Sequence, residues 1–539
     1  MKKPGIIKGV QIDEQDLFNK ACDTGHEVNE RDPRKELEAV ITVVWFKRDL
    51  RIYDHRPLAE AVTKGSVLPL FVFEPSVWEA GDVSVRHKDF VMESLQELDE
   101  QLSKRGARLY TAIGEMTDIL QELVLHLGPF RLHAHEENGT PNTFRRDIAV
   151  RSWMKGKGFP MKEWPHFGVT RGLKTRDAFQ KGYEAYVSGE LTPAPERMDS
   201  RSGQLPACLK QGVQEPLTLK IPGEGIQTGQ KGGERAAHGT LRSFLDARYK
   251  GYQLKISKPY ASADSCSRLS PYLAWGNVSV RYTYQETVKA IQQSASGFEQ
   301  QQLSAFLSRL HWHCHFIQRI EDEPEIVTRT MNPAFDTIRQ DWDEQAYQAW
   351  LQGKTGIPLI DAAMRCLHET GWLNFRSRAM VLSFVCNTLM LDWRRPSVDL
   401  ARLFLDYEPG IHYSQVQMQA GTTGFNTIRI YNPVKQGQDH DAKGAFVRRF
   451  VPELRTVPDA FIQEPWKLPA GLPDGYPSPI VDVAKANGEA RRILWSLKQS
   501  PEAREAAGAQ LNKHGSRKES RRRSTKKPRQ DFEQLDLFS

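Results

Sequence analysis

The chain has 539 residues, of which 39% are hydrophobic and 26% charged. This length predicts two or three domains, and the hydrophobic fraction is sufficient for buried cores. No run of about 18 apolar residues occurs, so we expect no membrane-spanning helix. The basic start of the chain lacks the apolar segment of a secretory signal, and we expect a cytoplasmic protein.

Positive charge is concentrated near the C-terminus. The formal net charge is +7, yet residues 513–529 alone contain nine Lys or Arg and one Glu. Residues 530–539 contain three acidic residues, which leaves +2 for the other 512 residues. Any affinity for nucleic acid must therefore come from a local patch or from this tail.

The six cysteines are far apart and form no C-x-x-C pair. This spacing argues against zinc ribbons and iron–sulfur clusters, and it favours thiols in a reducing compartment. We expect no metal site.

Residues 39–168 have the pattern of a parallel α/β domain, after an extension of uncertain structure over residues 1–38. AVITVVWF at 39–46, VLPLFVF at 67–73 and ARLYTAI at 107–113 are short β-branched and aromatic runs. Segments with apolar residues at helical spacing separate them. The alternation predicts a doubly wound parallel sheet.

The remainder of the chain changes character twice. Residues 169–233 are predicted to be an interdomain connector, because the part from Pro193 to Gly233 is rich in Gly, Pro, Gln and Ser. Residues 234–500 show apolar stripes at helical spacing and almost no strand pattern, which predicts an all-α domain. Residues 501–539 are low in complexity and are predicted to be disordered.

Several sequence blocks resemble the photolyase and cryptochrome family. The segment WFKRDLRIYDHRPL from Trp45 carries the usual marks of the family's opening strand and loop, Arg48, Asp49, Leu50, Arg51 and Asp54. Further blocks follow in the family's order over roughly 400 residues: GGERAAHGTLRSFLDARYKGY (232–252), CSRLSPYLAWGNVSVR (266–281), GKTGIPLIDAAMRCLHETGW (353–372), LDYEPG (405–410), RIYNPVKQGQDHD (429–441) and FVRRFVPEL (446–454). The resemblance implies that the helical part is an FAD-binding domain.

The residue types in these blocks suit a dinucleotide cofactor. Ser267 and Ser270 offer donors at a helix start, where a pyrophosphate is favoured, although both could be plain N-caps. Arg378 and Asp406 correspond to the family's ion pair beside the isoalloxazine ring, and such a pair favours an anionic reduced flavin. The resemblance implies that the flavin is also contacted by Tyr252, Cys266, Arg268, Leu269, Phe306, Arg309, His313, Glu408 and His412.

Other matched positions imply contact with DNA. Trp312 falls where family repair enzymes stack a tryptophan on pyrimidines flipped out of the duplex, but it could equally be a core aromatic residue of an amphipathic helix. Arg376 and Gln436 match positions that contact DNA near that cavity, and Trp393 matches the middle member of the family's photoreduction chain.

The chain departs from the family's pattern at the reacting centre. Arg309 occupies the position of the catalytic glutamate, and His412 that of the asparagine facing the flavin N5 in dimer-repair enzymes. Phe375 replaces another asparagine, and Val416 replaces the tryptophan nearest the flavin.

Three functions therefore stay open. The first is a deoxyribodipyrimidine photolyase that transfers an electron from excited reduced FAD to a flipped-out dimer, with Trp312, Arg309 and His412 as catalytic residues. The second is a cryptochrome-like photoreceptor without repair activity. The third is a photolyase for the six-four photoproduct, in which His311, His313, His315 or His412 acts as an acid.

The C-terminus suggests a protein partner. Its last residues include QLDLF, which resembles the peptide that docks bacterial repair proteins on the sliding clamp: Gln534, Leu535, Asp536, Leu537 and Phe538. The basic run before it could neutralise phosphates, so we expect a monomer that works at DNA, in the nucleoid.

The family's N-terminal domain can carry an antenna pigment. The segment HAHEENGTPNTFRRD, residues 133–147, lies in the corresponding region. The residues of this segment do not indicate whether the site holds a folate, holds a deazaflavin or is empty.

Overall fold

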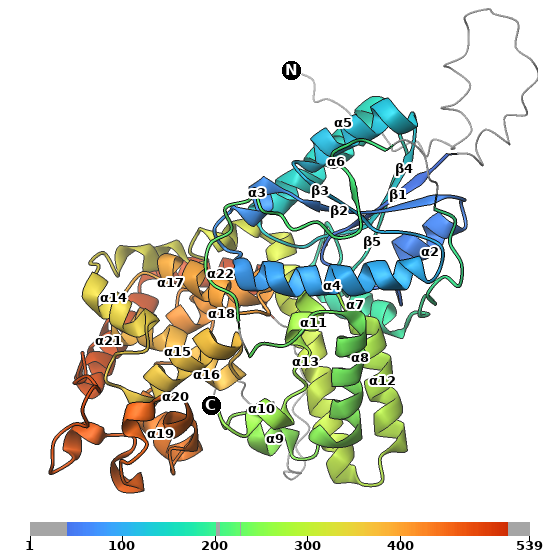
Figure 1. Ribbon diagram of the computed structural model, residues 1–539. Coiled ribbons are helices and arrows are strands. Elements are labelled where there is room, and N and C mark those ends of the chain that lie inside the picture. The colour runs from blue at the N-terminus through green and yellow to red at the C-terminus, as the bar shows by residue number, and fades with distance from the viewer. Residues whose placement is uncertain (1–39, 201–204, 227, 516–539) are drawn as a thin grey trace, which may run out of the picture. The chain divides into compact units, whose positions relative to one another are not determined.

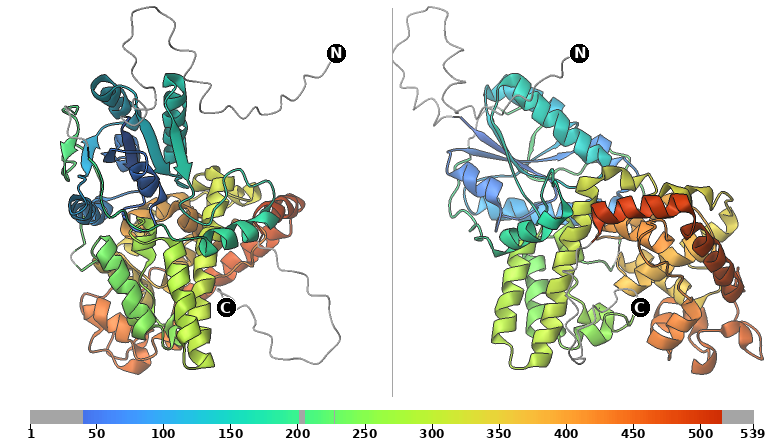
Figure 2. Two further views of the ribbon diagram at one scale, coloured as in Figure 1. Left: turned by 90° about the vertical axis from the view of Figure 1, so that its right-hand side faces the viewer. Right: turned by 180° about the vertical axis from the view of Figure 1, so that it is seen from behind.

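The computed structural model describes residues 40–200, 205–226 and 228–515. The described residues from Ile41 onward belong to one compact unit, which contains a sheet with its helices and a larger helical part (Figures 1 and 2). The extension predicted over residues 1–38 lies outside the described residues.

The N-terminal part is built on a six-stranded sheet with the strand order β5-β4-β1-β2-β3-β6. Strands β1 to β5 are parallel, which confirms the predicted parallel sheet. The short β6 pairs antiparallel with β3, and it comes from the segment predicted to be a connector. The strands are β1 (Thr42–Phe46), β2 (Val67–Phe73), β3 (Tyr110–Ile113), β4 (Arg131–His135), β5 (Met161–Trp164) and β6 (Lys210–Gln211).

The two faces of the sheet pack into different cores. Val43 and Trp45 point to the face covered by α5 and α6, whereas Val44 and Phe46 point to the face covered by α4 (Figure 1). Both faces are buried, which explains why β1 and β2 read as continuous apolar runs. The helices of this part are α2 (Arg56–Val62), α3 (Pro75–Trp78), α4 (Val85–Ser103), α5 (Met116–Leu127), α6 (Pro141–Lys157) and α7 (Phe179–Ser188).

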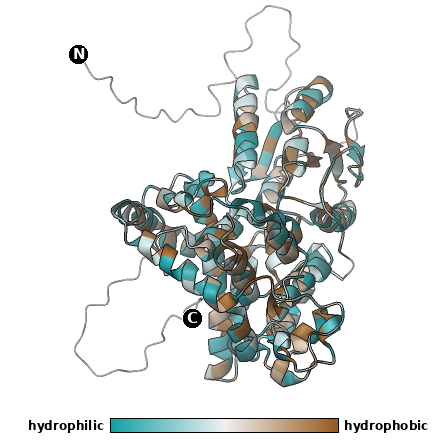
Figure 3. Ribbon diagram, turned by 90° about the vertical axis from the view of Figure 1, so that its left-hand side faces the viewer, coloured by the Kyte–Doolittle hydropathy of each residue, from teal (hydrophilic) through white to brown (hydrophobic). Residues whose placement is uncertain are grey.

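From residue 234 the described chain is helical and contains no strand, which confirms the predicted all-α domain. In Figure 3 the outer helices carry both teal and brown residues, as helices with one polar and one apolar face should. No described helix is both long and apolar enough to span a bilayer. The helices are α8 (Glu234–Ser243), α9 (Tyr252–Lys255), α10 (Ser262–Ser265), α11 (Ser270–Ala274), α12 (Val280–Gln293), α13 (Gly297–Asp322), α14 (Glu344–Leu351), α15 (Pro358–Thr370), α16 (Phe375–Ser383), α17 (Arg394–Leu403), α18 (Pro409–Ala420), α19 (Pro433–His440), α20 (Ala445–Phe450), α21 (Val483–Lys498) and α22 (Pro501–His514).

Helix α22 corrects the prediction of disorder from residue 501. Ser500 caps the helix by accepting a hydrogen bond from the Ala503 N–H, and Ala503 is buried in a small apolar cluster. At its other end His514 Nε2 lies 2.6 Å from Glu323 Oε2. The alanine-rich composition that looked like low complexity is that of a good helix former. Residues 516–539 lie outside the described residues.

Candidate cofactor and DNA-binding site

The helical part encloses a cavity of about 400 Å³, which we call the large cavity. Its wall is formed by α9, α11, α13, α16 and α18 and by the turns before α11 and α18. A cavity of this size is within the range of ligand pockets, about 300–1,000 Å³. It brings together most of the predicted site residues: Tyr252, Cys266, Ser267, Arg268, Ser270, Phe306, Arg309, Trp312, His313, Arg376, Arg378, Asp406, Glu408 and His412.

The turn before α11 is held in an unusual conformation. Arg268 has a φ of 60°, in the left-handed region that a non-glycine residue adopts only when its surroundings impose it. Arg248 donates to the Cys266 and Ser267 carbonyls, the latter at 3.1 Å, and Gln230 donates to the Arg268 carbonyl at 2.8 Å. These bonds fix the Ser267 and Ser270 donors at the cavity wall.

An ion pair closes another side of the cavity. Arg378 Nη2 lies 2.8 and 2.6 Å from the two carboxylate oxygens of Asp406. Arg378 Nε donates to the Leu373 carbonyl at 2.9 Å, and its guanidinium lies 4.0 Å above the ring of Phe404. These contacts hold a cation at the cavity wall in a single orientation.

Glu408 Oε1 and Arg309 Nε are buried polar atoms at the cavity that have no hydrogen-bond partner among the described residues. Burial raises the pKa of Glu408 to about 7, although Arg48 opposes the shift from 3.9 Å away. Unpaired buried polar groups are costly and point to a ligand that completes their bonding. A flavin dinucleotide, rich in hydroxyl, N–H and carbonyl groups, fits this donor and acceptor set.

The histidines of the cavity are neutral. His412 Nε2 donates to the Ser397 carbonyl at 2.8 Å, which leaves Nδ1 with its lone pair. Burial lowers the pKa of His412 to about 4, and that of His313 also to about 4. His311 and His315 lie outside the cavity lining: His311 bonds to Gln180 and His315 to Arg176.

The long helix α13 supplies the aromatic wall. Trp312 is half-buried, lines the cavity and contacts Phe316 at 5.7 Å between ring centroids. Nearby, Arg376 Nη1 donates to Gln436 Oε1 at 3.0 Å, so these two predicted DNA contacts belong to one pair.

Three predicted site residues do not line the cavity. Leu269 is buried before α11, and Gln436 reaches the cavity only through Arg376. Trp393 is buried at the start of α17 and donates to Thr330 Oγ1 at 3.3 Å. Val416, the position of the missing tryptophan, is completely buried in the core of the helical part.

Sequence reasoning missed other residues of the wall. Trp372 ends the block 353–372 but was given no role, and its ring lies 3.9 Å from the Arg268 guanidinium. Tyr407 separates Asp406 from Glu408 and lines the cavity, as does Tyr431 of the block 429–441. All three lie inside blocks that the sequence singled out, which was the available signal.

A second, smaller cavity lies at the carboxyl ends of β1 and β2, and we call it the crevice. It measures about 60 Å³, and its lining includes Trp45, Glu74, Trp78, Asp82, Glu137, Trp275 and Tyr407. Ligands of parallel α/β sheets bind at this edge. The residues 133–147 predicted to lie near an antenna pigment form the end of β4, a loop and the start of α6 beside it.

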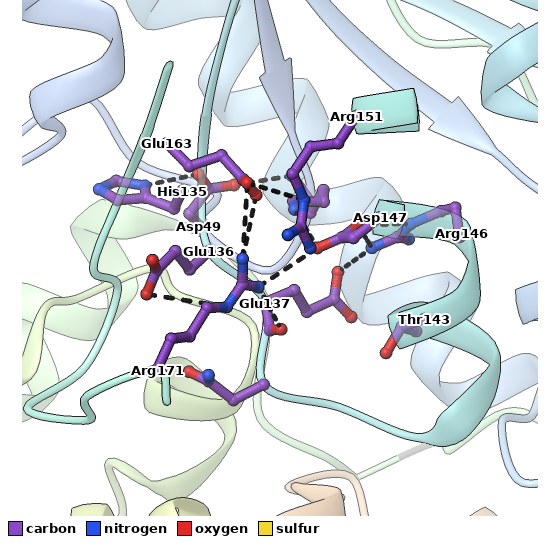
Figure 4. A network of polar contacts seen from close by, with 12 residues as sticks. Asp49, His135, Glu136, Glu137, Thr143, Arg146, Asp147, Arg151, Glu163 and Arg171 are labelled. Atoms are coloured by element: carbon purple, nitrogen blue, oxygen red, sulfur yellow. Dashed lines mark hydrogen bonds and ion pairs between the residues drawn. The ribbon is translucent and has the colours of Figure 1, made fainter. Parts of the chain in front are cut away.

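Figure 4 shows a network of charged side chains, of which Glu137 and Arg146 line the crevice. Arg146 lies 3.0 Å from Glu74, 2.5 Å from Glu137 and 2.9 Å from Asp147, and burial raises the pKa of Glu74 to about 7. Arg171 joins the network through Asp147 at 3.6 Å. At about 60 Å³ the crevice is smaller than an ordinary ligand pocket, about 300–1,000 Å³.

A buried cluster of Asp49, His55 and His135 has the spacing of a metal site but is satisfied by hydrogen bonds. His55 Nδ1 accepts from the Leu58 N–H at 3.1 Å, so its Nε2 carries the proton that it donates to Asp49 Oδ2 at 3.0 Å. His135 Nδ1 donates to the same oxygen at 2.7 Å. These hydrogen bonds thus stabilise the loop after β1.

Comparison with known proteins agrees with this architecture. Family models match for DNA photolyase over residues 42–169 and for the FAD binding domain of DNA photolyase over residues 306–496. A deoxyribodipyrimidine photo-lyase of Streptomyces griseus is 31% identical over 84% of this chain and 98% of its own length.

Solved structures resemble the fold closely. The bacterial class III photolyase from Agrobacterium tumefaciens superposes with a TM-score of 0.75 at 26% identity, covering 86% of this chain and 98% of its own. The archaeal photolyase from Sulfolobus tokodaii, described with two FAD molecules that imply a novel light-harvesting cofactor, has a TM-score of 0.71 at 25% identity over 85% of this chain and 100% of its own.

The fold and the large cavity define a flavoprotein in which a parallel α/β domain precedes a helical FAD-binding domain. The chain belongs to the photolyase and cryptochrome family.

Proposed function

We propose that the protein is a light-driven DNA repair enzyme of the deoxyribodipyrimidine photolyase type. The observation that carries the proposal is the half-buried Trp312 on the wall of the large cavity, on the same face of α13 as Arg309. An exposed aromatic face there can stack on a base flipped out of a duplex. A core tryptophan would be fully covered, as Trp350 and Trp393 are.

The cofactor is held by residues from five helices, α9, α11, α13, α16 and α18, and from the turns before α11 and α18. The fixed donors of Ser267 and Ser270 suit the pyrophosphate, and Arg378, Glu408 and His412 suit the ring system and its linker. Bound FAD, reduced and excited by light, supplies the electron that splits the dimer. Tyr252, Cys266, Arg268, Phe306, Arg309, His313 and Asp406 complete the proposed binding set, and Leu269 packs behind it.

Arg309 has a distinct task in this proposal. Its guanidinium is a cation on the cavity wall, so it stabilises negative charge that develops on a lesion carbonyl. A protonated glutamic acid at this position could donate only a hydrogen bond from an uncharged carboxyl group. Arg309 therefore replaces a neutral donor by a charged one, which is the stronger of the two.

Repair of a six-four photoproduct by a histidine acid is less well supported. His313 and His412 have pKa values lowered to about 4 by burial, so both are neutral near pH 7. The single N–H of His412 is already donated to Ser397. The photoreceptor alternative is favoured by a different observation, the loss of the tryptophan at Val416.

A repair assay separates the enzyme from the photoreceptor. The purified protein is reduced chemically, mixed with ultraviolet-irradiated oligonucleotides and kept in blue light or in darkness. Loss of dimers in light alone supports the proposal, and Arg309→Ala should slow repair per molecule of bound FAD, with FAD content measured first. Dimers that persist in light, together with a light-dependent change of shape, would establish a photoreceptor.

The tail gives a second proposal, which rests on sequence alone because residues 516–539 lie outside the described residues. Gln534, Leu535, Asp536, Leu537 and Phe538 bind the bacterial sliding clamp, and the basic run before them binds DNA phosphates without reading sequence. Leu537→Ala combined with Phe538→Ala should abolish clamp binding in a pull-down with purified clamp, while dimer repair on short DNA is unchanged. If the clamp retained the double variant as strongly as the wild type, this proposal would be wrong. We also propose that the protein is a monomer and acts in the nucleoid.

A further inference from the structure

Tyr407 lies between the large cavity and the crevice and lines both. Its side chain is buried, and its hydroxyl donates to Asp82 Oδ2 at 2.7 Å. Asp82 is half-buried as a residue and lines the crevice, whereas Tyr407 is buried. A redox-active side chain thus sits on the cavity wall with a base already hydrogen-bonded to it.

The tryptophans near the two cavities that have a guanidinium against the ring do not lose an electron easily. Removing an electron from a tryptophan leaves a cation, which a nearby guanidinium disfavours. The Arg268 guanidinium lies 3.9 Å from the ring of Trp372, and that of Arg48 lies 4.6 Å from the ring of Trp275. At Trp393 the Arg394 guanidinium lies 5.0 Å from the ring.

Tyr407 avoids this cost because its phenol can lose a proton together with the electron. The proton has a ready acceptor in Asp82, and the product on the ring is neutral. Burial raises the pKa of Asp82 above its ordinary value, despite Tyr407, Arg48 and Arg402, which makes its carboxylate a better base. Neutral His412 lies 5.3 Å from the Tyr407 ring and adds no positive charge.

We propose that Tyr407, with Asp82 as its proton acceptor, is the electron donor that photoreduces the cofactor bound in the large cavity, in place of the tryptophan missing at Val416. One electron leaves the Tyr407 ring for the light-excited oxidised flavin, and the phenolic proton moves to Asp82 Oδ2. The neutral tyrosyl is restored by one electron from a thiol in solution at the crevice, and Asp82 returns the proton. The inference rests on FAD occupying the large cavity, as the proposed function requires.

The test compares Tyr407→Phe with Tyr431→Phe, since both tyrosines line the large cavity. FAD content is measured first, and oxidised protein is then illuminated with blue light and dithiothreitol without oxygen. We expect Tyr407→Phe to slow photoreduction about tenfold or more and to remove the tyrosyl signal from electron paramagnetic resonance spectra of samples frozen under light. Tyr431→Phe should change neither.

Asp82→Asn is the second variant, because an amide oxygen keeps a hydrogen-bond acceptor but is a very poor base. It should also slow photoreduction while Tyr407 remains in place. Wild-type rates in both variants, or a tyrosyl signal that survives Tyr407→Phe, would overturn the inference. Chemical reduction of the flavin bypasses photoreduction, so chemically reduced Tyr407→Phe should repair dimers as the wild type does. If neither the chemically reduced wild type nor the chemically reduced variant repaired dimers, the proposed function would be wrong, whereas the role of Tyr407 in photoreduction would not be affected.

Discussion

The ion pair of Arg378 and Asp406 should be strongly coupled. The Asp406 side chain is 3% exposed and the Arg378 side chain 25%, with two bonds of 2.8 and 2.6 Å between them. Breaking a fully buried pair by removing one partner costs about 3–5 kcal/mol. Because water reaches a quarter of Arg378, we expect Asp406→Asn to destabilise the fold by about 2 kcal/mol, with a coupling energy of similar size.

The assay is a double-mutant cycle of Asp406→Asn, Arg378→Gln and the double variant, measured by urea unfolding of FAD-free protein. FAD binding is measured in parallel and should weaken in each of these three variants. The exposed pair of Arg395 and Glu344 serves as control, and its coupling should be much smaller because solvent screens it. If the buried pair couples no more strongly than the exposed one, the argument from burial is incorrect.

Three further predictions follow from the cavities. Trp312→Ala should weaken binding to dimer-containing DNA about tenfold in a fluorescence titration at unchanged FAD content; equal affinity would show that the ring does not stack on the lesion. Burial raises the pKa of Glu408 from 4.5 to about 7, so the folded FAD-free protein keeps a proton that the unfolded chain releases. The free energy of unfolding should fall as pH rises from about 4.5 through about 7, and Glu408→Gln should make this dependence on pH weaker. Glu74→Gln is a matched comparison, because the pKa of Glu74 is also raised to about 7. The purified protein should show the absorption of flavin without a second pigment, and a stoichiometric folate or deazaflavin would contradict the small size of the crevice.

The sequence predicted the sheet well because its strands are buried on both faces. The run VLPLFVF coincides with β2, Val67–Phe73, and the run at 39–46 contains β1, Thr42–Phe46. Such strands carry their own signal as continuous apolar runs. Strand β6 has two residues, Lys210 and Gln211, and is defined only by pairing with β3, so no local pattern could reveal it.

The site was predictable where family blocks marked single residues and unpredictable where contacts join distant segments. Matching singled out Arg378, Asp406 and Glu408, and all three line the large cavity. The role of Tyr407 depends on Asp82, which lies 325 positions earlier in the chain. The size of the crevice likewise depends on side chains from several strands and loops, and a linear sequence contains no measure of volume.

Helix α13 suggests how proteins of this fold change their chemistry. Arg309 and His313 line the large cavity and lie outside the apolar core, whereas Leu303 and Ile317 pack into it. Because Arg309 does not anchor the helix in the core, a charge can be exchanged at position 309 without moving the backbone. Reactivity can thus diverge within an unaltered scaffold, and the same separation offers protein engineers a small set of positions for redirecting it.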